Sequence, residues 1–190
     1  MDRNNKIWIG VGVVAGLCLC AAVVSFFVLR ELGSRVSNAF KTDPDEVAAV
    51  GDGIAKFDVP PGYELTMGMS FFNYDIVSIM PTPSASSDMT IMMMQFTSGA
   101  AANEEQMQEA LRQQTNQPNV QMRVVEQKTE IIRGEEVPVT ISESTSTESF
   151  ILRQWTAVFT GNKGPTILMI QGTTTNWDEE LIKDFIQSIH

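Results

Sequence analysis

A run of apolar and small residues without a single charge extends from Ile7 to Leu29, and it constrains this chain more than any other feature. About 20 apolar residues are enough to cross the hydrocarbon layer of a bilayer. Because no backbone group can stay unpaired inside lipid, such a run is expected to be helical. The sequence therefore predicts a transmembrane helix over residues 7–29, preceded by a short basic tail over residues 1–6.

A cleaved signal peptide is the alternative for this run. Arg3 and Lys6 form a basic amino-terminal region, and small residues around Ala21 resemble a cleavage site. The apolar run continues from Val23 to Leu29, however, which favours an uncleaved anchor. Basic residues flank the run on both sides, so they do not decide its orientation. The short tail before a long carboxyl-terminal domain is typical of a signal anchor, and we expect a single-pass cell-membrane protein with an extracytoplasmic domain.

The predicted helix carries a small-residue pair, Gly12 and Gly16, with GxxxG spacing. Such pairs let two membrane helices approach closely, so Gly12 and Gly16 are a candidate helix-dimer face for a homodimer. The two cysteines, Cys18 and Cys20, also lie in this run. The remainder of the chain therefore has no disulfide and no cysteine-based metal site.

The chain has a formal net charge of −10, and the excess of carboxylates lies after Lys41. Proteins that bind nucleic acid neutralise phosphates with Lys and Arg. An acidic domain repels both phosphate backbones and anionic headgroups, so we expect no nucleic-acid partner.

Residues 30–53 are predicted to form a juxtamembrane helical linker. Helix is expected to continue from Arg30 through Phe40, and a second helix to begin at Asp43 as N-cap with Pro44 at its first position. This second helix should end near Gly53 and space a globular domain, residues 54–190, from the membrane.

The domain shows apolar runs of strand type separated by short turns rich in Gly, Pro and Ser. A capped helix is predicted from Asn103 to Thr115, and another opens at Asn176 and continues to Ile189 with one apolar stripe. The separators indicate hairpins, so the fold class is predicted to be α+β, with helices packed on a mainly antiparallel sheet. The predicted strands are Glu64–Phe71, Tyr74–Met80, Met89–Thr97, Val120–Ile132, Glu136–Glu143, Phe150–Thr160 and Pro165–Thr173.

Two segments resemble a known family. The stretch from Phe57 to Tyr63, FDVPPGY, resembles the opening of PsbP-like domains, and the stretch from Ile167 to Ile189 resembles their closing strand and amphipathic helix. The members of that fold family mostly act by binding partners, so the resemblance implies a non-enzymatic role. No family binding residue can be matched to a position in this chain.

Catalytic groups are scarce. The one histidine, His190, stands at the end of the sequence given, where we expect a frayed segment unable to serve a triad or a zinc site. A carboxylate-based enzyme would need two carboxylates with separated pKa values. The candidate groups are Glu104–Glu105, Glu135–Glu136 and Asp178–Glu180, all at predicted helix starts or turns.

A cluster of methionines, Met67, Met69 and Met89–Met94, raises a Cu(I) hypothesis, because thioethers are soft ligands. Alternation along a strand would split this cluster between two faces, and core packing is the simpler interpretation. The Ser/Thr-rich stretch Thr140–Ser149 is interpreted as a polar hairpin tip.

These observations favour a membrane-anchored accessory or scaffold domain that is not an enzyme, uses no cofactor or metal, and binds another envelope or membrane protein. A sensor or carrier that binds a small ligand is the first alternative. A carboxylate-based enzyme is the second.

Overall fold

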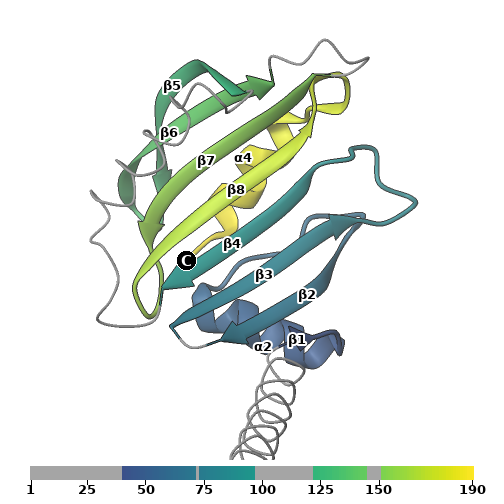
Figure 1. Ribbon diagram of the computed structural model, residues 1–190, viewed down its shortest axis with the longest axis vertical. Helices are drawn as coiled ribbons and strands as arrows, with labels where there is room; N and C mark the ends of the chain where they lie inside the picture. Colours follow the sequence, from purple (N-terminus) through teal and green to yellow (C-terminus); the bar gives the residue numbers. More distant parts are fainter. Residues whose placement is uncertain (1–39, 72, 97–121, 145–150) are drawn as a thin grey trace, which may run out of the picture. The chain divides into compact units, whose positions relative to one another are not determined.

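Antiparallel strands dominate the part of the chain that the computed structural model describes, which is residues 40–71, 73–96, 122–144 and 151–190 (Figure 1). Eight described strands form one sheet with the order β1-β2-β3-β4-β8-β7-β6-β5. Their bounds are β1 (Phe40–Lys41), β2 (Tyr63–Phe71), β3 (Tyr74–Pro81), β4 (Thr90–Phe96), β5 (Met122–Ile132), β6 (Glu135–Ser144), β7 (Leu152–Thr160) and β8 (Pro165–Thr173).

The predicted fold class is wrong. Strands make up 55% of the described residues and helices 20%, so this part is mostly a single eight-stranded antiparallel sheet with two α-helices, and not the predicted α+β class with a transmembrane helix. The helix predicted from Asn103 to Thr115 lies outside the described residues. The seven predicted strands are confirmed within two residues at each described end.

The predicted transmembrane helix was part of that fold class. No helix in the described ranges is both long and apolar enough to cross a membrane. The run from Ile7 to Leu29 itself lies outside the described residues.

Helix α2 (Pro44–Ile54) begins as the sequence predicts. The Asp43 side chain accepts hydrogen bonds from the backbone N–H groups of Asp45 and Glu46, and Pro44 occupies the first turn. The helix packs on β2 and β3, where Gly68 allows close approach: a Cβ at Gly68 would lie 3.2 Å from the backbone of Val47. Helix α2 is therefore part of the folded unit that begins at Phe40.

The start of this unit also differs from the prediction. Phe40 was expected to end a helix, but it forms the short strand β1 and pairs with Met69 of β2. The sequence pattern around Phe40 is that of a helix. Its conformation is decided instead by pairing with β2, which is distant in the sequence.

Helix α4 (Glu179–Ser188) presents its predicted apolar stripe to the sheet. Ile182, Phe185 and Ile186 are buried, as is Ile189 just after the helix. The side chain of Asp178, rather than Asn176, is the N-cap, because Thr174–Asn176 form a short 3-10 turn (η1) before the helix.

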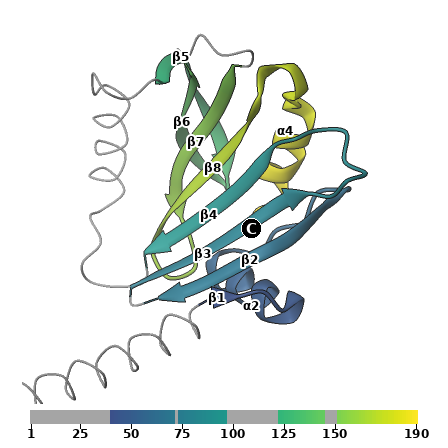
Figure 2. The ribbon, with the colours of Figure 1, turned by 45° about the vertical axis from the view of Figure 1, so that its right-hand side comes forward.

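Both helices lie on the same face of the sheet (Figure 2). The chain after α2 pairs with the chain after α4 through two backbone hydrogen bonds between Lys56 and His190, of 3.1 and 2.9 Å. The rings of Phe57 and Phe185 meet edge to face at 5.8 Å between centroids. This side of the sheet holds one continuous core that includes Val77, Met93 and Leu168 in adjacent strands.

The turn between β5 and β6 is a two-residue turn. Arg133 has φ +55° and Gly134 has φ +82°, so both central residues are left-handed, as a type I′ hairpin turn requires. This turn matches the right-handed twist of the two strands and fixes their register from Ile132 opposite Glu135.

Candidate functional site

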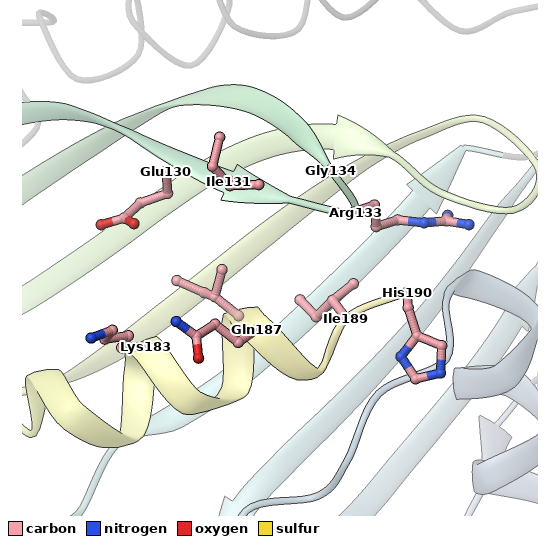
Figure 3. A pocket seen from close by; sticks show the side chains of 9 residues that line it. Glu130, Ile131, Arg133, Gly134, Lys183, Gln187, Ile189 and His190 are labelled. Atoms are coloured by element: carbon pink, nitrogen blue, oxygen red, sulfur yellow. The ribbon is translucent and has the colours of Figure 1, made fainter.

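A groove lies between the β5–β6 hairpin and α4, with a volume of about 660 Å³ (Figure 3). One wall comes from the end of β5 and its turn, and the other from the second half of α4 and the residues after it. We call this site the β5–α4 groove. Its lining residues are Glu130, Ile131, Arg133, Gly134, Lys183, Ile186, Gln187, Ile189 and His190.

Two isoleucines of the α4 wall make the groove partly apolar. Ile186 and Ile189 are 4% and 3% exposed and belong to the core. Ile131 of β5 is 57% exposed, but it lies on the face of the strand opposite to buried Ile132, so its side chain points away from α4 (Figure 3). The groove is therefore a surface feature rather than a closed cavity.

The groove also collects positive charge in an acidic chain. Arg133 and Lys183 line it, and neither forms an ion pair with another residue of the described ranges. The one acidic lining residue, Glu130, is paired with Lys128 at 2.9 Å between Oε1 and Nζ. Hydrogen bonding to Glu130, and then its negative charge, raise the pKa of Lys128 despite the opposing effect of partial burial.

The charged residues occupy two ends of the groove. Figure 3 shows Glu130 and Lys183 toward one end, and Arg133 and His190 toward the other. No acidic lining residue lies at the end with Arg133. Because Glu130 is paired with Lys128, each end of the groove keeps one cation, Lys183 or Arg133, without an ion-pair partner among the described residues.

Arg133 and His190 are both held in place. The Nη1 group of Arg133 donates to the carbonyl oxygen of Thr160 at 3.0 Å, which leaves its other N–H groups available. The backbone of His190 pairs with Lys56, and its Nδ1 lies 2.7 Å from the carbonyl oxygen of Ser188. The expectation of a frayed segment at His190 is therefore wrong.

Strand β5 runs along this groove as one edge of the sheet. It has 11 residues, pairs with β6 on one side, and has no other neighbour among the described strands. In an antiparallel edge strand, alternate residues direct their N–H and C=O groups away from the paired strand. About half of β5 therefore offers backbone donors and acceptors on its outer side.

The opposite edge of the sheet, strand β1, offers far fewer free backbone groups. Strand β1 has two residues, and a short edge strand is one of the means by which sheets limit pairing with other chains. On β5, two other features limit pairing with other chains: a register shift between Val124 and Glu126, and charged side chains. Beyond that shift, pairing with β6 is regular from Glu126 to Ile132.

A second, smaller cavity of about 430 Å³ lies beside the first half of α4. Four carboxylates line it: those of Asp58, Asp178, Glu180 and Asp184. Asp178 serves as the N-cap of α4 through bonds of 3.1 and 3.0 Å to backbone N–H groups. Asp178 and Glu180, at the cap and in the first turn, stabilise the start of the helix.

The carboxylate pairs singled out in the sequence do not converge. Glu135 and Glu136 are exposed at the start of β6, Asp178–Glu180 cap α4, and Glu104–Glu105 lie outside the described residues. Asp75 is the buried carboxylate of the described part, and it bonds to Lys163 at 2.8 Å and to Ser70 at 2.7 Å. That pairing makes Asp75 a structural ion-pair partner.

The methionines divide between the two faces of the sheet, as alternation predicts. Met89 and Met93 are fully buried in the core on the helix side. Met92 and Met94 alternate with them and are only partly buried, and Met92 pairs with Met169 across strands. Among the described residues, no group of three or more His, Cys, Asp or Glu side chains could hold a metal ion.

Several sequence predictions lie outside the described residues. These are the helix-dimer face at Gly12 and Gly16, the two cysteines, and the end of the Ser/Thr stretch from 145 to 149. The first part of that stretch, Thr140–Ser144, belongs to β6 and is not a hairpin tip.

The sequence analysis did not identify the residues of the β5–α4 groove. Arg133 precedes a glycine in a short separator, and Lys183 and Gln187 lie one turn apart on the polar side of α4. Each looks like an ordinary surface residue, and their common location depends on which strand lies beside α4. No protein-family model matches this chain, and no curated protein matches it at a significant level.

Proposed function

We propose that residues 40–190 form a non-enzymatic accessory or scaffold domain that binds an extended segment of another protein at the β5–α4 groove. The observation that supports this proposal is the open edge of β5 beside a partly apolar groove. A peptide in extended conformation can add to such an edge by backbone hydrogen bonds, while neighbouring grooves receive its side chains.

An open edge is a feature of every unclosed sheet, so the residues beside the edge carry the argument. Ile131 is 57% exposed on the face of β5 that is turned away from α4, and the groove on the other face is lined by buried Ile186 and Ile189. Truncating or charging an exposed apolar side chain beside such an edge should affect binding more than folding.

The small-ligand alternative is less well supported by this geometry. Sites for small molecules usually bury most of the ligand surface, typically about 70–90%. An open groove beside an edge strand suits a peptide that lies along it. A carboxylate-based enzyme is also less well supported, because the buried carboxylate Asp75 is already paired with Lys163.

Location at a membrane, with the domain on the extracytoplasmic side, is also a proposal, supported by the uncharged run from Ile7 to Leu29. The resemblance to PsbP-like domains stays a prediction, and it agrees with a role in partner binding.

The test is chemical crosslinking of the full chain in its native membranes, comparing wild type with Ile131→Lys and Ile151→Lys. Both isoleucines are exposed, 57% and 43%, but only Ile131 lies on the edge strand β5. We expect Ile131→Lys to lose a crosslinked partner that wild type and Ile151→Lys retain. Equal capture by all three proteins would exclude the edge of β5 as the contact surface.

A further inference from the structure

The face of the sheet opposite to α2 and α4, which we call the outer face, is apolar at its centre. Antiparallel sheets with one solvated face usually carry polar residues on that face. Here, residues that pair across five neighbouring strands instead form one continuous apolar row, which we call the outer row. Its members, from β2 through β3, β4 and β8 to β7, are Met69, Ile76, Met94, Ile167 and Val158.

No charged side chain interrupts the outer face over β4, β8 and β7. Strands β4 and β8 contain no Asp, Glu, Lys or Arg. The one charged residue of β7, Arg153, alternates with the outer row and lies on the helix side, 5.6 Å from the ring centroid of Trp177. Strands that are apolar on both faces are typical of sheets covered on both sides. Both described α-helices lie on the other face, so neither covers the outer row (Figure 2).

The connection from β4 to β5 has to pass the strands between them. The strand order places β8, β7 and β6 between β4 and β5, and the successive antiparallel pairings make β4 and β5 parallel to each other. A connection between parallel strands returns from one end of the sheet to the other and usually contains a helix. Residues 97–121 are this connection, and they include the helix predicted from Asn103 to Thr115.

The handedness of such a connection selects the face that it crosses. Connections between parallel strands of one sheet are right-handed in about 98% of cases. Figure 1 shows the sheet from the outer face, with β4 pointing downward and β5 to its left. In that orientation a right-handed connection passes in front of the sheet, which is the outer face. The helix side is also already filled by α2, α4 and the core beneath them.

We propose that residues 97–121 cross the outer face, and that the predicted helix packs its apolar side on the outer row. Met107, Ala110 and Leu111 recur at helical spacing, so they share one side of that helix. Methionine side chains on both surfaces adapt well to such a contact. The outer face is then a second core layer rather than a docking surface.

The dimensions agree with this assignment. A helix of about 13 residues is roughly 20 Å long, and the usual strand spacing of about 4.8 Å places β5 roughly 19 Å from β4. The inference does not depend on the proposed function, since it concerns the outer face and not the edge of β5.

The test is photo-crosslinking within the full chain in its native membranes. The photoreactive residue p-benzoylphenylalanine replaces either Leu111 on the apolar side of the predicted helix or Arg112 on its polar side. Light-activated benzophenone inserts into nearby C–H bonds and favours those of methionine, and mass spectrometry identifies the joined peptides. We expect position 111, but not position 112, to join to the methionines of the outer face. These are Met92, Met94 and Met169.

Other crosslinks would overturn the inference. Joining of position 111 to Met89 or Met93 would place the connection on the helix side, where both residues are buried. Joining between isotope-labelled and unlabelled chains made in the same cells would make a second copy the occupant of the outer face. Capture of another protein there, or no crosslink to the outer face, would equally contradict the assignment.

Two lysine variants of the full chain test the same contact through stability. Leu111→Lys and Gln108→Lys each add one positive charge, but only Leu111 belongs to the apolar side of the predicted helix. We expect Leu111→Lys to lower the urea midpoint of unfolding, because a charge would be buried against the outer row, and Gln108→Lys to leave the midpoint unchanged. Equal midpoints for the two variants would contradict packing of this helix on the sheet.

Discussion

Two hairpin turns lie at the same end of the sheet, and they are built in opposite ways. The turn between β7 and β8, residues 161–164, packs on the end of α2: Asn162 donates from its backbone to Ile54 at 2.8 Å and from its side chain to Asp52 at 3.0 Å. In the turn between β5 and β6, a Cβ added at Gly134 would meet no heavy atom of the described residues within 4 Å.

Buried Gln95 completes the first of these turns. Its side-chain amide donates to the carbonyl oxygens of Ile54 and Gly164 and to the hydroxyl of Thr166, at 3.2–3.4 Å. One turn thus fastens the sheet to α2, whereas the glycine of the other turn has free space around it. We expect substitutions in the first turn to cost more stability than substitutions in the second.

The largest effect is expected for Gly161→Ala in the packed turn. A Cβ at Gly161 would collide with the side chains of Gln95 and Thr166 and would lie 3.0 Å from the carbonyl oxygen of Ile54. Overpacking of this kind lowers the free energy of unfolding by about 3 kcal/mol. Urea unfolding measures the change, and a loss below about 0.5 kcal/mol would show that this turn does not fasten the sheet.

A somewhat smaller effect is expected for Gln95→Ala, which removes the amide and leaves a small cavity. We expect a loss of about 2 kcal/mol in the free energy of unfolding. Gln127→Ala, an exposed glutamine on β5, is the matched control and should change stability by less than about 0.5 kcal/mol. Similar losses in both variants would remove the distinction between the two hairpins.

In the open turn, Gly134→Ala should cost about 1 kcal/mol, because the residue must keep φ near +82° although the space around it is free. Urea unfolding again gives the value. A loss as large as that of Gly161→Ala would mean that the open turn is packed after all.

The smallest effect concerns the Lys128–Glu130 pair beside the open turn. The pKa of Lys128 is raised above 10.5 in the folded state, so its contribution to stability is full below pH 10.5 and is lost as the pH rises through the folded-state pKa. The difference in stability between wild type and Glu130→Gln should therefore be constant up to that pH and shrink above it. A difference that stays constant at higher pH would contradict the pairing.

The sequence predicted the strands well because each has a local signal. Alternation along β4 and β8, and a turn residue such as Gly134, are readable without knowledge of the rest of the chain. The apolar stripe of α4 is equally local. The α+β class also counted the helix predicted from Asn103 to Thr115, which lies outside the described residues.

The groove could not be predicted in the same way, because it depends on the order of the strands. Strand β8 pairs with β4, and β7 and β6 follow, so β5 becomes an edge strand far from β4, which precedes it among the described strands. Nothing near Ile131 or Lys183 in the sequence records that pairing.

Amide hydrogen exchange of the full chain tests the central claim most directly, because it reports which backbone groups of β5 are free. From Glu126 to Ile132, alternate amides should exchange rapidly, while all amides of β7 that pair within the sheet stay protected. Binding of an extended partner segment at this edge should slow the rapidly exchanging amides. Protection of every β5 amide in the chain alone, equal to that of β7, would show that this edge is already covered and would contradict the account.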